Sequence, residues 1–163
     1  MSRRYRARYV GAVVVLGATM GCASYASVGQ DYAAVGKHEL AVPYYAQHYR
    51  GHADDPQARD DLKRAIDAAL KNIDADYDSL SRSGRFDEAL GLAIRREQLL
   101  DYARSMGLDE FNLDEAGRLV DEALPRAGKL ALKRVDDAEG SGVPAIELLG
   151  LLRTAVALMP DDA

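Results

Sequence analysis

The chain has 163 residues, of which 48% are hydrophobic and 29% are charged, and its formal net charge is −5. This length and composition fit one folded domain, and they are unlike those of a disordered chain or of a set of membrane-spanning helices. The acidic balance argues against nucleic acid as a partner, because phosphates require a basic surface.

The first 21 residues have the arrangement of a secretory signal peptide. Four arginines lie within residues 3–8. The apolar stretch that follows, over 9–20, is about 12 residues long and too short to span a hydrocarbon core of ~30 Å. The segment contains no acid, so its removal leaves a net charge of about −9. We therefore predict a signal peptide over residues 1–21 and a mature domain over residues 22–163.

The single cysteine of the chain lies directly after this segment. The sequence Thr19-Met20-Gly21-Cys22 resembles the bacterial lipobox, in which a small residue precedes a lipidated cysteine. The resemblance implies diacylation of the Cys22 sulfur, cleavage before Cys22, and acylation of the new amino group. Thr19 and Met20 depart from the residues usual at those positions. The alternatives are an ordinary secretory signal, with Cys22 as a bystander, and an uncleaved anchor.

The lipobox resemblance also implies a location. One acyl chain binds a bilayer only marginally, whereas two or three hold a protein firmly. Ala23 and Ser24 follow the cysteine, and neither is acidic. In the enterobacterial sorting rule, an acidic residue at that place retains a lipoprotein at the inner membrane. We therefore predict a lipid-anchored protein of the bacterial envelope, at the outer membrane and facing the periplasm.

Apolar residues at helical spacing predict six helices in the mature domain. They cover residues 25–35, 38–50, 56–82, 86–106, 112–137 and 144–158. The turns between them are marked by Gly36, a loop over 50–53, Ser83-Gly84, Gly107 and residues 140–142. Helix starts are marked by Asp55-Pro56 and by the capping-box pair Asn112 and Glu115.

Two prolines lie inside the predicted helices. We expect Pro43 to cause a kink or a late helix start, and Pro125 to kink or split its helix, because proline removes a backbone hydrogen bond. No stretch of the chain alternates as a strand does. The predicted fold is therefore all-α, with antiparallel helix pairs that form either a tetratricopeptide-like helical repeat or an α-helical bundle.

Residues 25–45 resemble the first two-thirds of a tetratricopeptide repeat. The matching positions are Tyr25, Val28-Gly29, Tyr32, Gly36, Ala41 and Tyr45. Small residues at such positions let two helices approach closely, and the aromatic rings fill the space between them. The closing Ala and Pro of the repeat are replaced by His48 and Ala53.

Two weaker copies follow, one around Gly84 and Ala89 and one over residues 152–161. The turn glycines Gly36 and Gly84 are 48 residues apart, whereas a regular array repeats about every 34 residues. The chain is therefore interpreted as a divergent repeat protein. The alternative is that a glycine followed by a small residue is simply how tight helical hairpins pack.

Aromatic side chains concentrate in the first predicted helix pair. The candidate partner-binding residues are Tyr32, Tyr44, Tyr45, His48 and Tyr49. Rings that stay exposed would offer an amphipathic surface for a peptide. The alternative, which we favour for most of them, is that they pack in the core.

The histidines, aspartates and arginines are weaker candidates for a functional site. His48 and His52 are four residues apart and are followed by Asp54 and Asp55, which suggests a metal-binding or hydrolytic helical domain as an alternative. However, Gly51 is expected to end the helix, and no HExxH pattern is present. We predict no catalytic residue, no bound metal and no cofactor. The arginines at 82, 85, 95 and 96 either meet an acidic partner or pair with Glu88 and Glu97.

Together these features predict a non-catalytic, membrane-anchored lipoprotein that acts as an adaptor or assembly factor. Its partners would be the membrane, through Cys22, and another envelope protein. Resemblance to tetratricopeptide lipoproteins implies roles such as helping an outer-membrane secretion or pilus channel assemble. The alternative is a structural envelope lipoprotein without a specific groove.

Overall fold

The structure is a computed structural model that describes residues 24–111 and 116–159. It contains six helices: α1 (Tyr25–Ala34), α2 (His38–Gly51), α3 (Pro56–Arg82), α4 (Phe86–Ser105), α5 (Ala116–Gly140) and α6 (Ala145–Leu158). No described residue lies in a strand. The all-α fold with antiparallel helix pairs is therefore confirmed. Asn112 and Glu115, the predicted capping pair, lie outside the described residues.

α1 and α3 begin where a capping side chain accepts a hydrogen bond from a free backbone amide. The Asp55 carboxylate accepts a hydrogen bond from the Gln57 amide at 2.9 Å, and Pro56 occupies the first helical position of α3. The Ser24 hydroxyl does the same for the Ser27 amide at the start of α1, at 3.2 Å. Both residue types are preferred at this position because their oxygens replace missing helical acceptors. The predicted start at Asp55-Pro56 is confirmed.

Left-handed glycines end four of the helices. Gly36, Gly84, Gly107 and Gly142 have φ angles between +67° and +75°. After α1, the Gly36 amide donates to the Ala33 carbonyl, and the Lys37 amide donates to the Tyr32 carbonyl, both at 3.0 Å. This paired arrangement closes a helix C-terminus and needs a residue that adopts positive φ without strain. The predicted turns at these glycines are confirmed.

The prolines interrupt neither helix. α2 begins at His38 and continues through Pro43, and α5 runs unbroken through Pro125. The predicted late start of α2 and the predicted split of α5 are therefore wrong. Pro43 and Pro125 are both exposed, while buried residues such as Val42 and Ala127 hold the helices on the core. Packing of the apolar face outweighs the loss of one backbone hydrogen bond.

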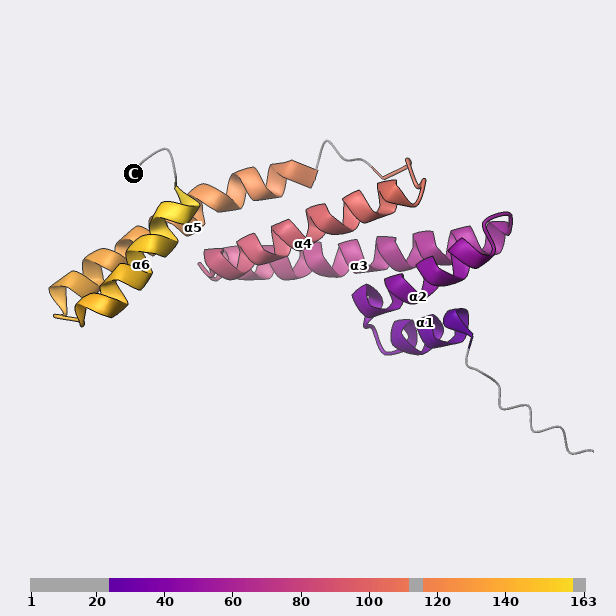
Figure 1. Cartoon of the computed structure of the whole chain (residues 1–163), viewed down its shortest axis with the longest axis horizontal. Helices are drawn as coiled ribbons and strands as arrows, with labels where there is room; N and C mark the ends of the chain where they lie inside the picture. The colour runs from indigo at the N-terminus through magenta and orange to yellow at the C-terminus, as the bar shows by residue number, and fades with distance from the viewer. Residues whose placement is uncertain (1–23, 112–115, 160–163) are drawn as a thin grey trace, which may run out of the picture.

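Each helix packs chiefly against its neighbours in the sequence, so the molecule is an elongated array (Figure 1). α3 and α4 lie side by side in the middle, with α1 and α2 at one end and α5 and α6 at the other. The largest fully buried side chains include Leu62, Ile66 and Ile73 of α3 and Leu100 of α4. Leu99 contacts both of the two larger core clusters. A third cluster, between α5 and α6, buries only Ala131, Val135 and Ala155.

Candidate functional site

A groove lies between α2 and α4, which both pack against α3. It consists of two adjoining cavities of about 390 and 280 Å³ that share Glu39 and Arg95. We call it the α2–α4 groove. Its lining residues are Gly36 to Leu40, Val42, Pro43, Asn72, Asp76, Arg95, Gln98, Leu99 and Tyr102. Three helices and one turn thus contribute to a single concave surface.

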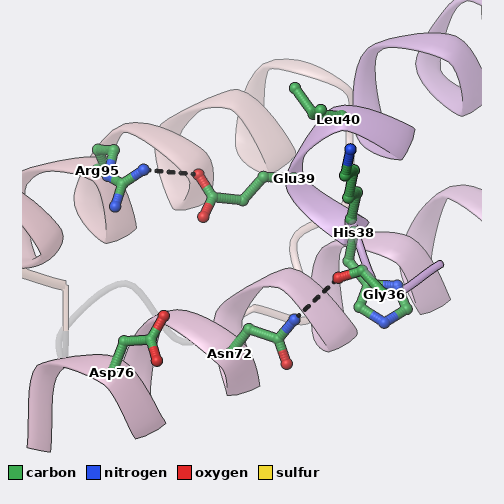
Figure 2. A pocket seen from close by; sticks show the side chains of 8 residues that line it. Gly36, His38, Glu39, Leu40, Asn72, Asp76 and Arg95 are labelled. Carbon is green, nitrogen blue, oxygen red and sulfur yellow. Dashed lines mark hydrogen bonds and ion pairs between the residues drawn. The ribbon is translucent and has the colours of Figure 1, made fainter. Parts of the chain in front are cut away.

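The polar groups of the groove are held in place by contacts between helices. The Arg95 guanidinium of α4 donates to the Glu39 carboxylate of α2 at 3.4 Å (Figure 2). The Asn72 amide of α3 donates to the Gly36 carbonyl, also at 3.4 Å, and thereby connects α3 to the first turn. Asp76 lies one helical turn further along α3. The groove therefore presents charges of both signs.

Apolar side chains line the rest of the groove. Leu40 and Pro43 of α2 are exposed, and Leu99 of α4 is half-buried. Tyr102 also lines the groove, and the Arg50 guanidinium lies 6.0 Å from the centroid of its ring. A concave surface with apolar contacts and a few fixed polar groups is suited to holding side chains of another molecule.

The candidate tyrosines lie outside this groove and divide into two environments. Tyr45 is 7% exposed and belongs to the core, where burial raises the pKa of its phenol. Tyr32 and Tyr44 stack with their centroids 5.4 Å apart, and the charge and hydrogen bond of Tyr32 raise the pKa of Tyr44. Tyr49 is half-buried against the core. The binding role predicted for these rings remains a prediction, with Tyr45 the least accessible of them.

The two histidines meet at the end of α2. The His48 and His52 rings have centroids 4.5 Å apart, and α2 ends at Gly51, between the two histidines, as expected. His52 Nδ1 donates to the His48 carbonyl at 3.0 Å, so this nitrogen is not available as a ligand. Among the described residues, no group of three or more His, Cys, Asp or Glu side chains has the geometry to hold a metal ion.

Sequence reasoning singled out Arg95 as part of a basic cluster, but it did not find the α4 residues beside it in the groove. Within that cluster, Arg85 pairs with Glu88, as one alternative predicted, and Arg96 pairs with Asp74 at 2.7 Å. One sequence pattern could have indicated the ion pair in the groove, namely an acidic residue three positions after a turn glycine. Glu39 follows Gly36 in this way and Asp87 follows Gly84, and each pairs with an arginine of a later helix.

Cys22, the predicted lipidation site, lies outside the described residues. Within the described part of the chain, no helix has both the length and the hydropathy needed to cross a bilayer. No protein-family model matches the chain, and neither a curated protein nor a solved structure matches it.

Proposed function

We propose that this protein is a membrane-anchored, non-catalytic adaptor that binds a segment of another envelope protein in the α2–α4 groove. The observation that carries the proposal is the groove itself. It places exposed apolar side chains beside a Glu39–Arg95 pair that connects its two walls. Interfaces of this kind combine apolar anchors with polar groups that fix orientation.

The side chains that line the groove indicate which kind of segment could bind there. Leu40, Pro43 and Leu99 offer apolar contacts, while Lys37 and Arg95 alternate with Glu39 and Asp76. The segment bound there would be amphipathic, with apolar side chains facing the groove and charges of both signs at its edges. The acidic balance of the whole chain, −5, disfavours a strongly acidic partner.

The adaptor proposal is tested by photo-crosslinking in native envelopes, with Gln98 replaced by p-benzoylphenylalanine in the full chain. We expect an adduct with another envelope protein. In the same chain, Leu40→Asp should reduce the adduct on the order of tenfold, because it places a charge among the apolar contacts of the groove.

Ile94→Asp is the matched control. Ile94 is an exposed apolar residue of α4, as Leu40 is of α2, but it does not line the groove. The adduct should survive this change. An adduct lost equally in both variants, or no protein adduct at all, would contradict the proposal.

Anchoring is tested separately by Cys22→Ser. If the Cys22 sulfur carries the anchor, this variant loses the acyl mass and leaves the membrane fraction. Mass spectrometry and fractionation of the full chain measure both effects. Retention in the membrane at a mass changed only by the substitution itself would show that the N-terminal segment acts in another way.

A further inference from the structure

The last helix of the array has an uncovered apolar face. α6 packs on α5 through Leu148, Leu151, Ala155 and Leu158. The opposite side, which we call the α6 face, consists of Ile146, Leu149, Leu152, Arg153 and Val156. Ile146 is 79% exposed, Leu149 53% and Val156 49%. Large apolar residues at consecutive turns of one helix face form a patch that usually marks an interaction site.

The first helix has a comparable face at the other end of the array. The α1 face consists of Tyr25, Val28, Asp31, Tyr32 and Val35. Val35 is 67% exposed and Tyr25 54%. Val28, Asp31, Tyr32 and Val35 line a notch of about 300 Å³ together with Lys37. Helical arrays normally end in polar capping faces, and among the described residues neither α1 nor α6 presents one.

The two faces complement each other. Both faces place apolar residues at the same spacing along a helix. On α1 these residues are Tyr25, Val28 and Val35, and on α6 they are Ile146, Leu149 and Val156. The α1 face carries the exposed Asp31, with Lys37 in the turn beyond it, and the α6 face carries the exposed Arg153, whose charge is opposite to that of Asp31. Neither charge forms an ion pair with the residues that the structure describes. When the faces dock antiparallel, Val35 lies opposite Ile146, and Asp31 lies within one helical turn of Arg153.

We propose that the α6 face of one copy docks against the α1 face of a second copy, so that the helical array continues from chain to chain. The contact is head to tail and leaves a free face at each end, so it adds copies instead of stopping at two. Pairing two α6 faces would bring two Arg153 residues together without an acid on either face. Pairing two α1 faces in the same register would bring two Asp31 carboxylates together, because Lys37 lies beyond Val35 at the far end of the notch. The charges therefore favour the mixed contact.

The proposal is tested by cysteine crosslinking between two differently tagged full-length copies, both carrying Cys22→Ser. One copy carries Val35→Cys and the other carries Ile146→Cys. After mild oxidation of a detergent-free lysate of cells that express both, we expect a mixed disulfide between the two tags. The yield of this mixed disulfide should exceed the yield of a disulfide between two copies with the same tag at least about fivefold. Ile94→Cys, exposed but on neither face, should not crosslink to either copy.

Charge reversal supplies the second arm. Asp31→Arg or Arg153→Asp alone should lower the mixed disulfide on the order of tenfold, because like charges then meet in the contact. Both changes together, one in each copy, should restore the mixed disulfide.

Three results would overturn the proposal: a mixed disulfide whose yield does not depend on these charges, a predominance of disulfides between copies with the same tag, or no disulfide at all. No disulfide is also the result expected if a lipid surface covers these faces. Because the product joins two copies of this chain, its absence would leave the Gln98 adduct test unaffected.

Discussion

In the first helix pair, Gly29 of α1 packs directly against the Tyr45 ring of α2. A Cβ atom added to Gly29 of α1 would lie 3.1 Å from ring carbons of Tyr45 on α2. Gly29 is buried, and Tyr45 belongs to the same core cluster as Leu62 and Ile66 of α3. The ring therefore occupies the space that any larger residue at position 29 would need.

Gly29→Val should destabilise the protein by about 1–3 kcal/mol, because the added methyl groups force the Tyr45 ring or the α1 backbone to move. Urea unfolding followed by circular dichroism measures the change. Gly91→Val is the control, since Gly91 is also within a helix but has open space around its Cβ position. Its effect should stay within about 0.5 kcal/mol. Equal effects of the two substitutions would show that the ring yields freely.

The contact between Gly29 and Tyr45 also shows how much the sequence predicts about single residues. The sequence predicts that small residues and aromatic rings pack between the first two helices, and the structure shows Gly29 against Tyr45 as one such pair. The groove residues Gln98 and Tyr102 could not be predicted in the same way. They reach the groove only because α4 and α2 lie on the same side of α3, and no local sequence signal reports that arrangement.

At the level of whole helices, the starts and turns followed from local chemistry. Asp55-Pro56 and the left-handed glycines act within a few residues, so sequence patterns identify them. The late start of α2 and the split of α5 were wrong for the opposite reason. Whether Pro125 splits α5 depends on how firmly the helix packs on α4 and α6, and that energy comes from residues far away in the sequence.

The six helices should differ in local stability. α6 packs chiefly on α5 and contributes one buried residue, Ala155, whereas α3 contributes eight. We expect amides of α6 to exchange at least about a hundredfold faster than those of α3, because local opening of α6 exposes little apolar surface. Hydrogen exchange should be measured in the Arg153→Asp variant, because the proposed docking of a second copy on the α6 face would also slow exchange in α6. Equal protection of α3 and α6 would mean that the array opens only as a unit.

At the scale of the whole molecule, the fold class was predictable and the functional surface was not. Helical periodicity and the lack of strand alternation were sufficient for an all-α assignment. The order of packing, in which α2, α3 and α4 build one groove, depends on the angles between helices. These angles arise from side-chain packing and not from periodicity.

The packing of each helix against the next one along the chain also bears on how the protein reaches this structure. Most contacts join residues that are near each other in sequence, so the relative contact order is low, and low contact order is associated with fast folding. α1 and α2 can pair before α5 has been made, and each later helix adds to a surface that already exists. If the chain is exported in an extended form, it can assemble in the order in which its segments emerge, without first bringing distant segments together.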